Sequence, residues 1–231
     1  MAGRNKGKIM MTRKTKGWSA LAAVFAVVAL GSAAPASAAE SSAARLSAQW
    51  WQHAASIPMA QNPILDESGD YCSFGQRGDV WYLHGSFGNT LGSPIVRHCT
   101  IPRGQRLLVP VVNVLCTPFA GETVEDNVKL CKDFMDAVDL KMLTVDGQDR
   151  TKQIRRFGAS SPFAVTMPVD SIFGYPAGTY VSVADGYYAL LPPPALGEHT
   201  IHFQGGVVAW GFTVDVVYHI NVVEPGVVIF P

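Results

Sequence analysis

The sequence predicts a mainly β fold: a β-sandwich or a jelly-roll-like pair of antiparallel sheets, with two short peripheral helices. The chain has 231 residues, of which 48% are hydrophobic, so it can bury a sizeable core. It also has 22 Gly and 15 Pro, which is too many turn formers for a coiled coil or a helical bundle. Beyond the N-terminal region, short apolar runs alternate with turn residues, as they do in antiparallel sandwiches.

The first 38 residues have the composition of a secretory signal peptide. They hold six basic residues and no acidic one, and an apolar run over 20–30 is followed by small residues that end in Ala36-Ser37-Ala38. The run of about eleven residues is shorter than the roughly 20 that cross a bilayer, and an uncleaved N-terminal anchor is the alternative. We therefore expect cleavage between Ala38 and Ala39, secretion with no later membrane association, and one β-rich domain over residues 39–231.

The charge of this domain differs from the charge of the whole chain. The whole chain has 18 basic and 18 acidic residues, and the leader holds six of the basic ones, so residues 39–231 carry 12 basic against 18 acidic side chains. A formal charge of 12 − 18 = −6 argues against nucleic acid or an anionic membrane as a partner.

In the first half of the domain we expect a helix over 41–56, a strand over 80–84, a strand over 106–112 and a helix over 124–138. Pro110 cannot donate to a strand ladder, so its strand lies at an edge or carries a bulge there. Thr123 and Asp126 have the spacing of a helix N-cap and its reciprocal partner. Cys131 falls on the apolar face of this second helix.

From Leu140 onward we expect strands and turns: residues 143–147 end a strand in a turn, and further strands cover 161–167, 179–184, 186–191, 197–204 and 212–222. Asp146-Gly147 is a hairpin turn signal. Asp185-Gly186 indicates either a two-residue hairpin turn or a bulge within one longer strand.

The strand over 212–222 has the clearest pattern. All six even positions from Phe212 to Val222 are apolar, whereas Val217 is the single apolar residue among the odd positions. This alternation predicts a strand with one face in the core, paired antiparallel with residues 197–204. The matching register places His202 beside Thr213 and Asp215 on the other face.

Four cysteines, all outside the leader, predict two disulfides in an oxidising compartment. Of the three connectivities, we prefer Cys72–Cys99 with Cys116–Cys131, because sequence neighbours close the shortest loops. Each bridge of this kind contributes roughly 3 kcal/mol. A zinc site is the competing interpretation, but no Cys-x-x-Cys spacing supports it, and we expect neither a metal nor a cofactor.

Several motifs resemble a pattern found in exported bacterial proteins of no assigned activity. They are Trp50-Trp51, Asn62-Pro63, Leu65-Asp66 with Gly69 and Cys72, Gln76 to Gly85, Cys99 to Gly104, Val145-Asp146-Gly147, Asp185 to Tyr188, and Gly197 to Phe203. The resemblance covers nearly all of the domain. It implies only a secreted, cysteine-bridged, β-rich protein, since no catalytic role is attached to these positions.

Histidines beside carboxylates are the candidate catalytic groups. His202 and Asp215 on an open strand face suit acid–base chemistry, although a surface polar ladder is the commoner meaning. His84 and His98 lie near Gly-rich loops, where a hydrogen-bonding loop histidine is the usual role. His199 and His202 point to opposite faces of a strand, which argues against a shared metal. The sequence has neither a nucleophile elbow nor a zincin motif, so we assign no catalytic residue.

Two further features are candidates for binding. The acidic stretch 66–70 has oxygen ligands that suit calcium but lacks the EF-hand spacing, so a solvated turn is the expected structure. Trp210 falls in the loop of the C-terminal hairpin and is the tryptophan that we expect to be exposed. The remaining tryptophans of the domain are expected in the core.

These observations favour a non-enzymatic secreted β-sandwich that binds an extracellular ligand or serves structurally, with His84, His202, Asp215 and Trp210 as candidate binding residues. The alternative is a secreted hydrolase that uses histidine and carboxylate side chains near the C-terminal hairpin. A cleft that holds His84, His202 and a carboxylate would favour the hydrolase, and a flat surface with an exposed tryptophan would favour the binding protein. Neither the ligand nor the oligomeric state follows from the sequence.

Overall fold

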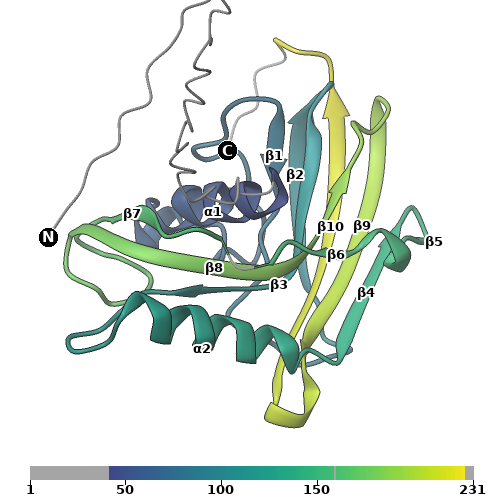
Figure 1. Cartoon of the computed structure of the whole chain (residues 1–231). Helices are drawn as coiled ribbons and strands as arrows, with labels where there is room; N and C mark the ends of the chain where they lie inside the picture. The colour runs from purple at the N-terminus through teal and green to yellow at the C-terminus, as the bar shows by residue number, and fades with distance from the viewer. Residues whose placement is uncertain (1–41, 159, 227–231) are drawn as a thin grey trace, which may run out of the picture. The chain divides into compact units, whose positions relative to one another are not determined.

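A computed structural model describes residues 42–158 and 160–226; the leader, its predicted cleavage site at Ala38 and Ala39, and Ser41 lie outside these residues. The described chain is mainly β and forms two five-stranded sheets with two α-helices (Figure 1). None of its helices is long and apolar enough to cross a membrane. The predicted fold class, a β-sandwich-like pair of sheets with two peripheral helices, is confirmed.

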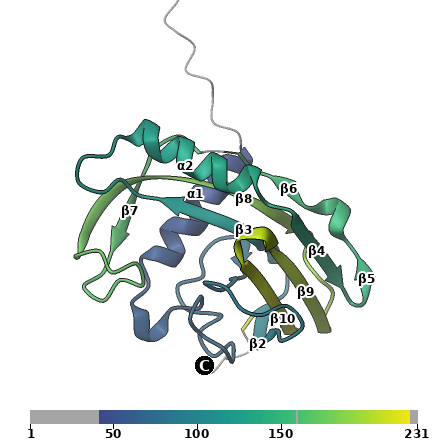
Figure 2. The same ribbon diagram turned by 90° about the horizontal axis from the view of Figure 1, so that it is seen from below.

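Sheet A has the order β1-β3-β8-β6, with β7 also paired to β8, and sheet B has the order β2-β10-β9-β4-β5 (Figure 2). Sheet A contains β1 (Val80–Tyr82), β3 (Arg106–Cys116), β6 (Arg155–Arg156), β7 (Phe163–Met167) and β8 (Gly178–Leu191). Sheet B contains β2 (Ile95–Pro102), β4 (Leu140–Val145), β5 (Gln148–Asp149), β9 (Gly197–Val207) and β10 (Phe212–Val223). The α-helices are α1 (Ser42–Ala55) and α2 (Val124–Asp136), and short 3-10 turns cover Met59–Gln61, Thr151–Gln153 and Val208–Trp210.

Two strand pairs are parallel, which the antiparallel expectation did not include. β1 pairs with β3, and β2 pairs with β10, in parallel. The other ladders are antiparallel, including the predicted hairpin of β9 and β10 and the Asp146-Gly147 turn between β4 and β5. Parallel partners need long connections, so local turn signals do not reveal them.

Because of a bulge in β3, the side chains before and after it pack into two different hydrophobic clusters. The register against β8 shifts between Pro110 and Val112, as the proline predicts. Before the bulge, Leu107 and Val109 pack against sheet B; after it, Val112 packs against α2. The opposite face of sheet A is covered by α1, so the two helices lie on opposite sides of this sheet (Figure 1).

The Asp185-Gly186 motif is neither a turn nor a bulge, because β8 runs through it as one continuous strand. Asp185 is buried and accepts hydrogen bonds from Arg156 Nε at 3.1 Å and Nη2 at 2.7 Å. A Cβ on Gly186 would lie 2.6 Å from Asn113 Cβ, so no larger residue fits there without movement. The motif therefore reflects a buried ion pair and a close strand contact.

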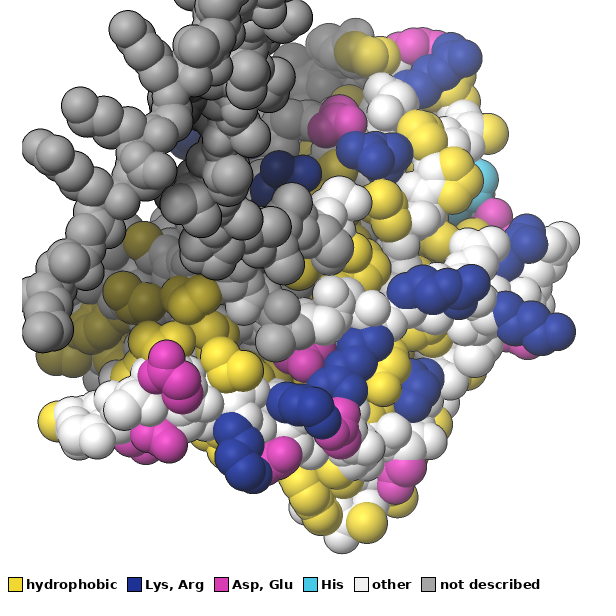
Figure 3. All heavy atoms as spheres, in the orientation of Figure 1, with side chains coloured by type: hydrophobic (Ala, Val, Ile, Leu, Met, Phe, Trp, Pro, Cys, Tyr) yellow, Lys and Arg dark blue, Asp and Glu magenta, His cyan; other side chains and the backbone are white. Residues whose placement is uncertain are grey.

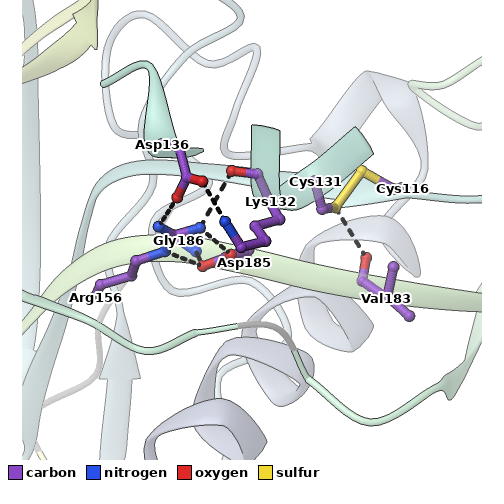
Figure 4. A network of polar contacts seen from close by, with 8 residues as sticks. All are labelled: Cys116, Cys131, Lys132, Asp136, Arg156, Val183, Asp185 and Gly186. Atoms are coloured by element: carbon purple, nitrogen blue, oxygen red, sulfur yellow. Dashed lines mark hydrogen bonds and ion pairs between the residues drawn. A yellow bond between two sulfur atoms is a disulfide. The ribbon is translucent and has the colours of Figure 1, made fainter. Parts of the chain in front are cut away.

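The second helix is capped and bridged as predicted. Thr123 and Asp126 form a capping box at its N-terminus. A disulfide joins Cys131 to Cys116 at the end of β3, and Arg156 joins Asp136 of the helix to Asp185 of β8 (Figure 4). The helix is thus attached to sheet A by both a covalent and an ionic link.

The second disulfide, Cys72–Cys99, joins the turn-rich segment after α1 to β2. The predicted pairing of all four cysteines is therefore present. Within sheet B, the even positions from Val214 to Val222 are buried as expected; of the odd positions, His219 and Asn221 are exposed, whereas Asp215 is buried.

Basic side chains gather on the face formed by α2 and the segment from β4 to β6 (Figure 3). Acidic side chains lie among them, and Lys129, Lys132 and Arg156 form ion pairs with Asp133, Asp136 and Asp185. Part of this positive charge is therefore neutralised locally.

Candidate binding cleft

His84 lies in the loop that follows β1, as expected, but its ring is in the core and the expected hydrogen bonding of this ring is wrong. Its side chain is 0% exposed, and its ring packs beside Trp50 and His53 at centroid distances of 5.2 and 5.3 Å. Neither ring nitrogen has a hydrogen-bond partner among the residues that the structure describes. Burial, together with the charge of nearby Arg97, holds the pKa of His84 well below its usual value. A neutral, enclosed imidazole of this kind cannot exchange protons with a substrate.

The predicted contact between His202 and Asp215 is present, with Nε2 2.7 Å from Oδ1. The face on which they lie is not open at Asp215, however, because the segment 89–92 covers this carboxylate. Burial of Asp215 favours its neutral form, but hydrogen bonds from His202 and from the backbone of Gly92 outweigh it and lower the pKa. The pair therefore fixes a neighbouring loop in place.

His84 and His202 are separated by sheet B. The backbone of His84 contacts the hydroxyl of Tyr218, whose side chain is buried on the core side of the sheet. His202 pairs with Val217 and points to the other face. The cleft required by the hydrolase hypothesis, with His84 and His202 together, is not formed.

A polar groove of about 630 Å³ lies over the outer face of sheet B. Its lining includes His98 and His219, which occupy paired positions on β2 and β10 and stack at 5.1 Å. His98 is thus a strand residue and not the loop histidine that we expected. Among the described residues, no three His, Cys, Asp or Glu side chains lie close enough together to hold a metal ion.

His199 at the border of this groove is held by two acceptors. Its Nδ1 lies 2.8 Å from Asp146 Oδ2 and its Nε2 lies 3.0 Å from the Ala195 carbonyl oxygen. The contact with Asp146 raises the pKa of His199. Because both ring nitrogens face acceptors, the protonated ring satisfies both and is a structural link between two loops.

The acidic stretch 66–70 forms a hydrogen-bonded turn. Asp66 Oδ1 accepts from the backbone of Ser68 and Gly69, and Oδ2 accepts from the backbone of Tyr71. Burial raises the pKa of Asp66, but these hydrogen bonds outweigh it, so the net shift is downward. The expected turn is therefore present, stabilised by its own backbone.

A concave site of about 260 Å³ is lined almost entirely by aromatic and aliphatic side chains (hereafter the aromatic cleft). It is lined by Trp50, Trp51, Ile64, Gly85, Ser86, Phe87, Asn113, Val114, Leu115, Phe134, Phe173 and Phe212. Small-molecule and peptide sites are typically concave and apolar with a few polar groups, and here Ser86 and Asn113 supply those groups.

One side of the cleft, which we call the α1 wall, is a series of touching rings. Trp51 lies edge-on to Trp50 at 4.7 Å, Phe173 lies 5.8 Å from Trp51, and Phe87 lies 5.9 Å from Phe173. Trp50 and Trp51 are buried, as expected for core tryptophans, and form the inner end of this wall. Phe87, at the outer end, is 49% exposed.

The opposite side, which we call the α2 wall, is a second series of rings. Phe134 of α2 lies 5.6 Å from Phe212 at the start of β10 and 5.7 Å from Trp210 in the hairpin loop. Trp210 is 60% exposed, which confirms the sequence prediction. Hydrophobic side chains are visible at this tip of the molecule (Figure 3).

The loop that carries Phe87 is held by two buried anchors. Arg97 is 1% exposed and donates to the carbonyl oxygens of His84 at 2.6 Å and Gly85 at 3.0 Å. Further along, Asn89 bonds the backbone of Asp215, and the Asp215 carboxylate accepts from Gly92 N–H. These contacts give the cleft a preformed border, which reduces the entropy cost of binding.

Sequence reasoning missed most of the cleft. Phe87, Phe134, Phe173 and Phe212 come from four separate segments, and no motif or periodicity links them.

Comparison with protein-family models, with curated proteins and with solved structures found no match.

Proposed function

We propose that this protein is a secreted, non-enzymatic binding domain that holds an apolar ligand in the aromatic cleft. The observation that carries the proposal is the cleft itself, with two aromatic walls that continue outward to the exposed rings of Phe87 and Trp210. Exposed aromatic surface costs free energy in water, and such surface around a concavity is typical of a binding site.

Secretion is supported by the leader-like N-terminus and by the two disulfides. Paired cysteines persist in oxidising compartments, and all four cysteines of this chain are paired. A ligand outside the cell is therefore the expected occupant of the cleft.

Binding of the fluorescent apolar probe 1-anilinonaphthalene-8-sulfonate to the folded protein tests this proposal. We expect saturable binding that Phe87→Ser weakens about tenfold, because the substitution removes the outer ring of the α1 wall. Phe119→Ser is the matched control: Phe119 is 65% exposed but does not line the cleft. Equal affinity of both variants, with unchanged melting temperatures, would contradict the proposed site.

A further inference from the structure

Within residues 42–158 and 160–226, the second half of β3 pairs with a strand on one side and with none on the other. β1 pairs with Arg106 to Leu108, and one more hydrogen bond, from Leu83 N–H to the Leu108 carbonyl, extends this contact. β8 pairs with β3 as far as Cys116. The stretch from Val112 to Cys116 is therefore an edge of sheet A, and its Asn113–Leu115 portion lines the aromatic cleft.

The hydrogen-bond pattern of β8 shows which groups of β3 point to this edge. The carbonyl oxygens of Gly186 and Ala184 accept from Phe157 and Ser160, on the side of β8 that faces away from β3. In an antiparallel ladder such residues alternate with those that bond the partner. Their opposite residues on β3, Asn113 and Leu115, consequently direct their backbone N–H and C=O groups into the cleft.

The two aromatic walls flank this edge. The α1 wall and the α2 wall come from the two layers that cover opposite faces of sheet A, and the edge of β3 lies between them. Asn113 and Leu115 are separated by roughly 7 Å, two residues of an extended chain. The cleft thus combines a row of backbone donors and acceptors with apolar surface on both sides.

We propose that the ligand is an extended apolar peptide that adds to β3 as a further strand of sheet A. The inference rests on the proposed function and names the ligand class. Backbone groups of the peptide pair with Asn113 and Leu115, while its alternate side chains contact the α1 wall and the α2 wall in turn. Because the cleft lining contains no charged side chain, it selects peptides with large apolar residues on both faces.

The test uses the peptide acetyl-Val-Phe-Val-Phe-Val-Lys-Lys-amide and three versions of it, N-methylated singly at the second, third or fourth residue. In an added strand, successive N–H groups point alternately to the edge and away from it. We expect methylation to lower affinity about tenfold at the positions that face β3 and to have little effect at the others. We also expect slower hydrogen exchange of the Asn113 and Leu115 amides when the unmethylated peptide is bound.

Leu115→Pro provides the protein-side test. The substitution removes an N–H that points to the edge and leaves the bonds between β3 and β8 in place. The variant should lose about tenfold or more in affinity for the unmethylated peptide, and it should bind the three methylated peptides with nearly equal affinity, because the N–H that distinguishes them is gone. If the proline prevents folding, the methylated peptides with the unaltered protein decide the question.

The outcomes separate the two proposals. Equal effects of methylation at all three positions, with retained probe binding, would overturn strand addition and leave the apolar binding site standing. Loss of both probe and peptide binding would overturn the site itself. Protection of the Asn113 and Leu115 amides through self-association, detected by sedimentation without peptide, would assign the edge to a second copy and overturn the peptide proposal.

Discussion

Replacing His53 with Phe should reduce the sensitivity of this protein to acid. His53 lies on α1 beside His84, and burial lowers its pKa from 6.5 to about 4. Between these values the unfolded chain binds a proton at this position and the folded chain does not. Proton uptake therefore favours unfolding as the pH falls.

The size of the effect follows from the two pKa values. The stabilising contribution of His53 is complete above pH 6.5 and decreases as the pH falls toward 4. Between pH 7.5 and 5.0 the loss is about 2 kcal/mol, because one pKa unit corresponds to about 1.4 kcal/mol. This is a large part of the typical stability of a domain, about 5–15 kcal/mol.

Urea unfolding followed by tryptophan fluorescence at pH 7.5 and 5.0 measures this loss. His53→Phe should show a decrease in unfolding free energy about 2 kcal/mol smaller than that of the unaltered protein. The comparison uses the difference between the two pH values, so any packing cost common to both pH values cancels.

His199→Gln is the control with the opposite sign. Because Asp146 raises the pKa of His199, its contribution is present below pH 6.5 and is lost as the pH rises above the folded value. Removing His199 should therefore steepen the loss of stability in acid. An identical pH dependence of the unaltered protein and His53→Phe would refute the assignment of His53 as a buried neutral group.

The remaining predictions concern the hairpin, a disulfide and the N-terminus. Val216→Asp places an unpaired carboxylate in the core and should cost about 4 kcal/mol or more, whereas His219→Ala on the exposed face should change the melting temperature little; equal destabilisation would contradict the one-sided burial of β10. Cys131→Ala opens a bridge between residues 15 apart and should cost about 3 kcal/mol by urea unfolding, and a loss below about 0.5 kcal/mol would argue against a stabilising role. Mass spectrometry of the culture supernatant should find a new N-terminus within about two residues of Ala39, and recovery of the intact chain from membranes would refute cleavage.

Local patterns predicted the elements that local interactions determine. The capping box at Thr123, the alternation in β10 and the pairing of the cysteines each depend on residues close together in sequence or on a simple period. β2 escaped detection because Arg97 occupies a buried position where an apolar residue is expected. Its charge is satisfied by carbonyl oxygens and by Tyr218, which lie far from it in sequence.

The candidate site was predicted less completely, for a related reason. Trp210 was recognised because an aromatic residue beside a hairpin glycine has few ways to be buried. His84 was expected beside a Gly-rich loop with a hydrogen-bonded ring because Gly85 follows it, but α1 packs over this segment and encloses the ring without a hydrogen-bond partner among the described residues. Burial by a helix that is distant in sequence cannot be recognised from the residues next to His84, so tertiary packing overrides the loop signal of the nearby glycines.

The position of β10 between β2 and β9 in sheet B has a consequence for the order of folding. β10 lies between β2 and β9, although β2 is made long before it. The chain is synthesised from its N-terminus, so β2 cannot pair with β10 until the whole segment between Pro102 and Phe212 and then β10 itself have been made. During that interval its pairing edge is open to other chains, so nascent or truncated forms are exposed to aggregation. The Cys72–Cys99 bridge can form without β10, and it then limits the conformations of β2 while this strand is unpaired.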